Sequence, residues 1–374
     1  MRVAVKRSEL IEYFKYIIVA IRKDRWVANL FYRLADKNTR NGIQIFEDFC
    51  KSGHMKEKDI LAMRVLGDDA QIPAYRFENV LLRKNRRFYN GDESNFVNLF
   101  ASDYNDDFPD PFVRADILNW LYQVQALSGP TGDKGLFQVS ELARSLQVYG
   151  HSLAVIYREL AYLARKNLVL CENSAMPIEE GDLVKITIPG ALHLQMLRNV
   201  SYLSACAEDT LFKNTEVMTR ISNRLKFHES DSKLVVALNA RDLVNYLIEY
   251  RKEYLTNSDE LVSEKAIISS VDLNDSLHAV EQWIQADENL KKTISEIDYF
   301  TVDMDVDACV VSKNSGGVVC TIADKDVKGF ISSLEPKYSF PYDVYSKIKP
   351  GDILKCKVME FDFTHRSFQL KYLN

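Results

Sequence analysis

The chain has 374 residues, of which 47% are hydrophobic and 27% are charged, and its formal net charge is −5. This length exceeds one ordinary hydrophobic core, so we expect two to four domains, and the composition excludes a disordered or fibrous protein. Six scattered cysteines without a CxxC pair exclude a disulfide framework and a zinc-finger pattern, and they indicate reduced thiols.

Charge is distributed unevenly along the chain. The segment 259–305 holds twelve acidic residues against three lysines, so the rest of the chain is positive by about 4 and could bind a polyanion. Near the start of the chain, every short apolar run contains charged residues, which predicts neither a signal peptide nor a membrane span. We therefore expect a cytoplasmic protein.

Residues 1–110 are predicted to be mainly helical. Apolar side chains recur at helical spacing through Leu10, Phe14, Ile17 and Ile21, and further helices are expected over 56–67 and 75–84. The stretch 88–111 that follows is rich in Asp, Asn, Gly and Pro, which predicts irregular backbone and a domain boundary.

The next ninety residues alternate helices with short apolar strands. Helices are expected over 111–128, 139–147 and 151–169, and strands over 168–173 and 183–190. This order predicts a winged helix-turn-helix domain, whose third helix would face nucleic acid. Its candidate contact residues are Ser152, Tyr157, Arg158, Arg165 and Lys166. The alternative is a winged helix that serves only for packing or protein interaction.

Amphipathic helices return after residue 202 and include the acidic segment, and from Val306 the pattern alternates. Five short runs rich in Val, Ile and Phe, separated by turn residues, predict a small barrel of the OB type. The predicted fold class is therefore multidomain α+β, with a helical domain (1–110), a winged helix-turn-helix domain (111–202), a helical connector (203–305) and a C-terminal five-stranded OB-type β-barrel (306–374).

The last seventy residues resemble the S-one type RNA-binding domain. The resemblance rests on the Gly316-Gly317 turn, the run Gly329-Phe330-Ile331 and the run 349–352 before the fourth strand. Val318 and Ser332 stand where the family usually has an aromatic residue and a histidine. Aromatic stacking and basic side chains hold single-stranded nucleic acid. The resemblance implies RNA or single-stranded DNA contacts by Lys328, Phe330, Lys355, Lys357, Phe361, Phe363, His365 and Arg366. The alternative is that Phe330, Phe361 and Phe368 fill the barrel interior.

A second, fainter resemblance covers about the first two hundred residues. The segments 34–54 and 86–100 are similar to the helical lid of bacterial AAA-like and STAND-type P-loop NTPases, which implies a nucleotide-sensing role for Arg40. No GxxxxGK[ST] motif is present, and the run Gly129–Gly135 has the wrong spacing to bind phosphates. The basic run Arg83–Arg87 could meet a phosphate or be a solvated helix end.

Catalytic motifs are not found in the sequence. The six histidines fall singly, with no HExxH or GxSxG motif, so we expect no enzymatic activity, no metal and no cofactor. The preferred hypothesis is a non-enzymatic nucleic-acid-binding protein, with the winged helix as a second contact or a scaffold. The alternative is a regulatory module of a P-loop NTPase that acts through protein partners.

Overall fold

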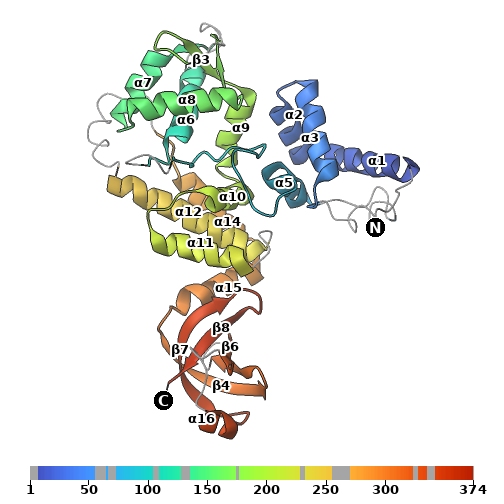
Figure 1. Cartoon of the computed structure of the whole chain (residues 1–374), viewed down its shortest axis with the longest axis vertical. Coiled ribbons are helices and arrows are strands. Elements are labelled where there is room, and N and C mark those ends of the chain that lie inside the picture. The colour runs from blue at the N-terminus through green and yellow to red at the C-terminus, as the bar shows by residue number, and fades with distance from the viewer. Residues whose placement is uncertain are drawn as a thin grey trace. The chain divides into compact units, whose positions relative to one another are not determined.

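The computed structural model describes the chain over residues 7–54, 65, 73–103, 109–127, 135–173, 177–227, 232–254, 270–322, 327–334 and 342–373. Over these ranges the protein is mixed α/β, with fourteen helices, a three-stranded sheet and a closed five-stranded barrel (Figure 1). The chain divides into two compact units. We call Met1–Ser222 with Val236–Trp283 the N-terminal unit, and Asn223–Val235 with Ile284–Asn374 the barrel unit.

The predicted N-terminal helices are observed as α1 (Arg7–Lys23), α2 (Arg25–Ala35), α3 (Thr39–Lys51) and α5 (Ala74–Arg83). Asp24 and Asn38 cap α2 and α3, because each side chain accepts hydrogen bonds from backbone amides of the first turn. The helix predicted over 56–67 lies almost wholly outside the described residues. Within the described part of the chain, no helix combines the length and the apolar character needed to cross a membrane.

The irregular backbone predicted after α5 is confirmed over 86–103, but much of this segment is buried. Because it forms no helix or strand, its polar groups bond to side chains. The Val97 amide donates to Nε2 of His193 at 2.9 Å, and the Tyr202 hydroxyl donates to the Val97 carbonyl at 2.7 Å. The Gly91 amide donates to the Asp209 carboxylate at 3.0 Å. The segment is therefore held inside the N-terminal unit by partners that follow it by about a hundred residues.

Between residues 113 and 196, the three predicted helices and two predicted strands are observed, together with a short strand and a further helix that were not predicted. They are α6 (Val113–Leu127), β1 (Phe137–Gln138), α7 (Val139–Val148), α8 (Leu153–Arg165), β2 (Val169–Cys171), β3 (Leu183–Ile186) and α9 (Ile188–Met196). The strands form an antiparallel sheet in the order β1-β3-β2. The strand predicted to reach Gly190 ends at Ile186, because Thr187 caps α9 by accepting from the Gly190 amide at 3.1 Å.

Five further helices are described between α9 and the first strand of the barrel. They are α10 (Val200–Asp209), α11 (Thr215–Phe227), α12 (Lys233–Tyr254), α14 (Asn274–Gln285) and α15 (Glu288–Tyr299). The acidic stretch predicted as helical is interrupted at Asp287, whose carboxylate accepts from the Leu290 amide at 3.2 Å and caps α15.

All five predicted C-terminal strands are confirmed, and they close into a barrel. They are β4 (Asp305–Asn314), β5 (Gly317–Ile322), β6 (Val327–Ser332), β7 (Ile353–Asp362) and β8 (Ser367–Tyr372), with the helix α16 (Tyr342–Lys347) between β6 and β7. The strand order is β4-β5-β6-β8-β7, and β6 and β8 are parallel whereas the other pairs are antiparallel. Side chains such as Val318, Cys320, Ile331 and Phe368 fill the interior.

Candidate functional site

The outer face of β5 and β6 carries one aromatic ring and one cation. In the register of this antiparallel pair, Val319 faces Phe330 and Thr321 faces Lys328. These side chains point outward, because the alternating residues Val318 and Ile331 are fully buried in the barrel. Phe330 is half-buried and Lys328 is exposed, so the face combines a ring with a charge, as single-strand binding requires.

Alternation along β5 decides which of its residues reach the outer face. Val318, which stands at the place of the family's aromatic residue, is completely buried. Val319 occupies the outer position opposite Phe330. Ser332, the other departure, is also buried, and its hydroxyl accepts from the Leu334 amide.

Gly317 makes the position of the Phe330 ring possible. A Cβ atom at residue 317 would lie 2.7 Å from Cζ of Phe330 and 2.3 Å from the carbonyl oxygen of Ile331. Both distances are below any van der Waals contact, so a side chain at residue 317 would displace the ring or the strand. The observed position of the Phe330 ring therefore depends on the absence of a side chain at residue 317.

The turn between β7 and β8 lies at one end of this face. β8 runs parallel to β6 with Gly329 beside Phe368 and Phe330 beside Gln369, so the start of β8 lies next to Lys328. His365 and Arg366 in this turn are exposed. Asp362 organises the turn by accepting from Nδ1 of His365 at 2.8 Å. Burial alone would raise the pKa of Asp362, but the hydrogen bonds that it accepts in this turn lower it. Lys328 and Phe330 therefore share one face of the barrel, and the turn that carries His365 and Arg366 lies at the end of β8 nearest Lys328.

The two predicted lysines of β7 lie elsewhere. In the β4–β7 pair, Lys355 faces Asp307 and Lys357 faces Asp305, and Nζ of Lys357 lies 4.0 Å from Oδ1 of Asp305. Because β7 pairs only with β4 and β8, it borders neither β5 nor β6. Strand order therefore separates these lysines from the face that carries Phe330, and Asp305 partly offsets the charge of Lys357.

The two predicted aromatic residues near the end of β7 differ in role from Phe330. Phe361 packs against the barrel core, with its ring centroid 5.0 Å from that of Phe368. The ring centroid of Phe363 lies 5.1 Å from that of Phe361 and 5.9 Å from the guanidinium carbon of Arg224, which belongs to the same unit. The interior position expected as an alternative therefore holds for Phe361 and Phe368, whereas Phe330 stands on the outer face.

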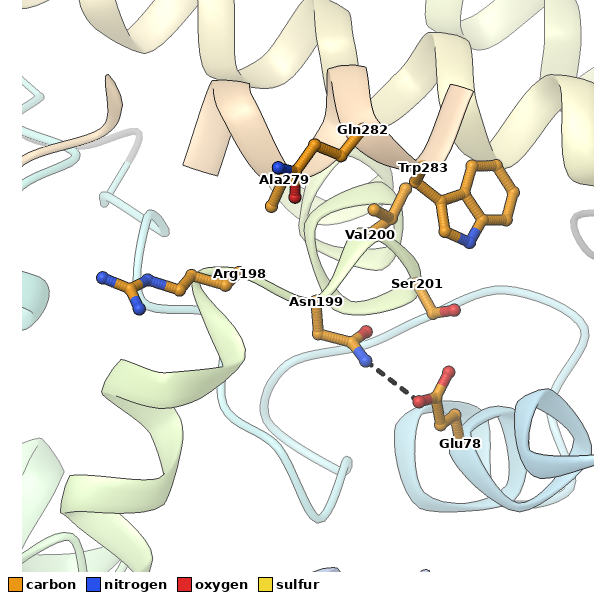
Figure 2. A pocket seen from close by; sticks show the side chains of 8 residues that line it. All are labelled: Glu78, Arg198, Asn199, Val200, Ser201, Ala279, Gln282 and Trp283. Carbon is orange, nitrogen blue, oxygen red and sulfur yellow. Dashed lines mark hydrogen bonds between the residues drawn. The ribbon is translucent and has the colours of Figure 1, made fainter. Parts of the chain in front are cut away.

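A hollow of about 440 Å³ lies in the N-terminal unit. Its lining comes from α5, from the junction of α9 and α10, and from α14, and consists of Glu78, Arg198, Asn199, Val200, Ser201, Ala279, Gln282 and Trp283 (Figure 2). None of these residues was predicted to be functional. No sequence motif marks them, because three separate segments bring them together.

Two of the residues on α8 that were predicted to contact nucleic acid, Arg158 and Lys166, bond to other residues of the protein. Arg158 donates to Glu159 at 2.8 Å and lies 4.0 Å from Asp103. The Lys166 ammonium donates to the backbone carbonyl of Asp92. Of the other candidates, Ser152 and Arg165 are exposed and Tyr157 is half-buried.

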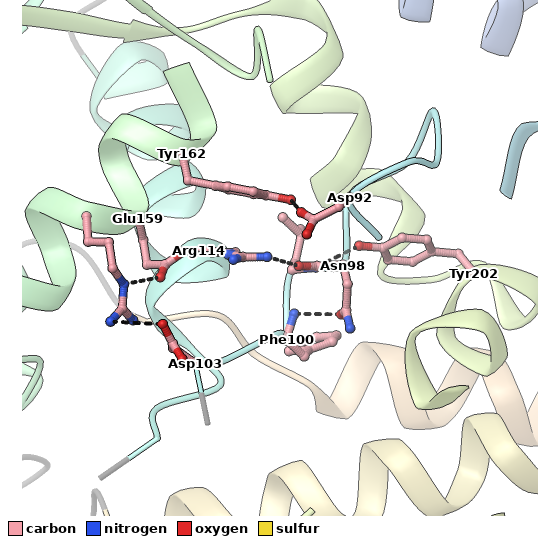
Figure 3. A network of polar contacts seen from close by, with 10 residues as sticks. Asp92, Asn98, Phe100, Asp103, Arg114, Glu159, Tyr162 and Tyr202 are labelled. Atoms are coloured by element: carbon pink, nitrogen blue, oxygen red, sulfur yellow. Dashed lines mark hydrogen bonds and ion pairs between the residues drawn. The ribbon is translucent and has the colours of Figure 1, made fainter. Parts of the chain in front are cut away.

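Further polar contacts join α8 to Arg114 of α6 and to the irregular segment 86–103. The Tyr162 hydroxyl donates to Asp92 at 2.7 Å, and the guanidinium carbon of Arg114 lies 3.9 Å from the Tyr162 ring centroid (Figure 3). Arg114 donates to Glu159 at 2.6 Å and to the Asn98 carbonyl at 3.1 Å. One side of α8 therefore binds the irregular segment of its own chain.

The residues of the NTPase-like interpretation do not form a nucleotide site in the described part of the chain. Arg40 is exposed near the start of α3, and the run Gly129–Gly135 lies almost wholly outside the described residues. In the basic run, Arg83 is buried and forms an ion pair with Glu208, and Lys84 lies 3.6 Å from Asp48. The first residue of this run is therefore paired inside the protein, whereas Arg86 and Arg87 are exposed at the end of α5.

Thr321 and Gln369 are residues of the barrel face that sequence reasoning missed. Both lie beside the predicted residues, since Thr321 faces Lys328 and Gln369 is next to Phe330. Strict in–out alternation from the buried Cys320 and Phe368 would have identified both as outward-facing. What the sequence lacks is the order of the strands, which decides their neighbours.

Comparison with known proteins gives little further information. No protein-family model matches the chain, and no curated protein matches it. Two solved structures of Mycoplasma genitalium RNase R are similar to it. The complex with ribose-methylated single-stranded RNA has 14% identity and a TM-score of 0.19, over 70% of this chain and 40% of that one. The apo form has 12% identity and a TM-score of 0.19, over 84% of this chain and 53% of that one.

The chain thus spans between 40% and 53% of the length of these structures. A TM-score of 0.19 is too low to relate two folds, so the match carries no functional argument.

Proposed function

We propose that the barrel binds single-stranded nucleic acid, RNA or single-stranded DNA, on the outer face of β5 and β6. The observation that carries the proposal is the outward ring of Phe330, with Lys328 on the same strand and the exposed His365 and Arg366 at one end of the face. Rings of this kind stack on bases, and cations beside them meet the phosphates.

The strand order supports this assignment. Numbered within the barrel, the strands follow the order 1-2-3-5-4, with a helix between strands 3 and 4. This is compatible with an OB fold, in which strands 2 and 3 and the loops between strands 1 and 2 and between strands 4 and 5 contact the ligand. In this protein those elements are β5, β6, the turn at Ser315-Gly316 and the turn 362–367.

For the region 113–186 we propose a winged-helix scaffold. Its support is the element order helix, strand, helix, helix, strand, strand, with the last two strands as a hairpin. The internal partners of Arg158 and Lys166 favour the scaffold over a second nucleic-acid contact. We therefore expect Arg158→Ala to leave oligonucleotide affinity unchanged.

Replacing Phe330 by alanine is expected to weaken binding of a single strand by about 1–3 kcal/mol, the value of one base–aromatic stack. The measurement is fluorescence anisotropy of the whole chain with labelled single-stranded RNA, single-stranded DNA and duplex DNA at low salt. Lys355→Ala is the matched control, because Lys355 is exposed on the other side of the barrel. Equal affinities of the two variants, or no binding by the wild type, would contradict the proposal.

Replacing Lys328 by alanine is expected to change the salt dependence of binding. If Lys328 neutralises one phosphate, the slope of log affinity against log salt becomes shallower by about 0.7 for a single strand. Phe330→Ala removes no charge, so it should lower affinity at every salt concentration without changing the slope. A Lys328→Ala variant with the wild-type slope would place the phosphates elsewhere.

The proposed function is non-enzymatic, so the labelled strand should stay intact throughout the binding experiment. Electrophoresis of the recovered RNA checks this directly, and shortened strands would contradict it. For the alternative, a regulatory module of a P-loop NTPase, no observation of the structure or of the matches speaks in favour. RNA and single-stranded DNA remain equal candidates, which the two labelled probes separate.

A further inference from the structure

The carboxylate of Glu78 is buried without a cation. Glu78 is 8% exposed, and its Oε1 accepts from the indole N–H of Trp26 at 3.1 Å and from the side-chain amide of Asn199 at 2.9 Å. Both donors are neutral. Among the residues that the structure describes, no Lys, Arg or His side chain forms an ion pair with it, and its second oxygen, Oε2, accepts no hydrogen bond from them and stays in contact with solvent.

Such a carboxylate is unusual, because buried charges in proteins are normally paired with an opposite charge. Two neutral hydrogen bonds compensate only part of the lost hydration of a charged group. The described part of the protein therefore leaves a negative charge whose natural complement is a cation from outside the chain.

The hollow described above gives access to this charge. In Figure 2, α5 with Glu78 and α14 with Trp283 form opposite walls, and the junction of α9 and α10 lies between them. Its volume of about 440 Å³ lies within the range of small-molecule sites. Arg198 extends away from Glu78 in this view and forms an ion pair with Asp275, so it does not neutralise the site.

We propose that this hollow binds an organic cation, an ammonium or guanidinium group, which pairs with Glu78 and lies against the indole of Trp283. A carboxylate with an aromatic wall is the arrangement that recognises such groups, because the ring face attracts a cation and the carboxylate accepts its N–H donors. Ser201 and Gln282 supply further polar groups at the wall. The site is independent of the barrel and of its proposed ligand.

The cation can come from a free polyamine or from a Lys or Arg side chain of a partner. Isothermal titration calorimetry of the full chain separates these sources with two probes: spermidine, and an acetylated, amidated Gly-Arg-Gly peptide. Binding of spermidine alone assigns the site to a free polyamine, and binding of the peptide assigns it to a basic side chain. No binding of either probe at low salt overturns the proposal.

Glu78→Gln is the decisive variant, since it keeps an acceptor for Trp26 and Asn199 and removes only the charge. We expect the affinity for the bound probe to fall at least about tenfold, which corresponds to 1.4 kcal/mol. Trp283→Leu should also weaken binding. Glu281→Gln is the matched control, because it removes the same charge from an exposed position on α14.

The control decides whether binding is specific. Wild-type affinity of Glu281→Gln, together with the loss in Glu78→Gln, supports the site. Equal losses in both variants would mean that the probes respond only to net negative charge, and would overturn the proposal. Circular dichroism of each variant shows whether it is folded, and Glu78→Ala serves as a second variant if Glu78→Gln is not.

Discussion

Replacing Glu208 by alanine is expected to lower the free energy of unfolding of the N-terminal unit by about 3–5 kcal/mol, because it leaves a buried guanidinium without its counter-charge. Arg83 is 3% exposed and pairs with Glu208, which also accepts from the Tyr89 amide at 2.8 Å. Burial raises the pKa of Glu208 although the charge of Arg83 lowers it. The same carboxylate thus holds α5 and the irregular segment on α10.

Urea unfolding followed by tryptophan fluorescence measures this loss selectively. The three tryptophans, Trp26, Trp120 and Trp283, all belong to the N-terminal unit, so their signal does not report the barrel. Glu93→Ala is the control, since its partner Arg86 is in the same basic run but the pair is exposed and contributes about 0–1 kcal/mol. A loss below about 1 kcal/mol in Glu208→Ala would refute the role assigned to this pair.

The stability of the N-terminal unit should also fall as the pH rises from about 6.5 to about 9, through deprotonation of His151. This ring is 3% exposed and lies between Asp110, at 2.5 Å from Nδ1, and Asp116, at 3.0 Å from Nε2. Burial alone would lower the pKa of His151, but the hydrogen bonds and charges of both carboxylates raise it from 6.5 to about 9.

The sign follows from proton linkage. The folded protein holds the proton of His151 more tightly than the unfolded chain does. The stabilisation that this proton provides is therefore complete below pH 6.5 and is lost as the pH rises through 9. A shift of this size corresponds to about 3 kcal/mol. Arg251, 3.7 Å from Asp116, also contacts this cluster.

His151→Gln tests the assignment. The stability difference between the wild type and this variant should be largest near pH 6 and should shrink toward pH 10, as measured by urea unfolding at each pH. His365→Gln, on an exposed turn of the barrel, should leave the tryptophan-detected profile of the wild type unchanged. A His151→Gln difference that is constant with pH would show that His151 is not charged in the folded protein.

The barrel shows which properties could be predicted from sequence. The five strands follow from alternation and turn residues, which are local signals, and all five are observed. The grouping of side chains was not predictable in the same way. Lys355 and Lys328 look alike in the sequence, but strand order places one opposite Asp307 and the other beside Phe330 on β6.

The N-terminal unit shows that the partners of charged residues are equally hard to predict from sequence. The run Arg83–Arg87 is the most basic of the sequence. Its first residue, Arg83, is nevertheless buried and pairs with Glu208, which lies 125 residues further along the chain. The spacing of polar residues likewise gives no indication that Glu78 and Trp283 line one hollow, since α5 and α14 come together around it only in the folded chain. Pairwise contacts across such separations are set by packing, which a single sequence does not display.

The irregular segment 86–103 also constrains the order in which the protein folds. Its amide and carbonyl groups depend on His193, Tyr202 and Asp209, which are separated from their partners by 96 to 118 residues. Contacts of such range carry a large loop-closure entropy, so they form late. We expect the nascent chain to leave this segment unstructured until α9 and α10 have been synthesised, and its buried amides to exchange with solvent only when the whole unit opens.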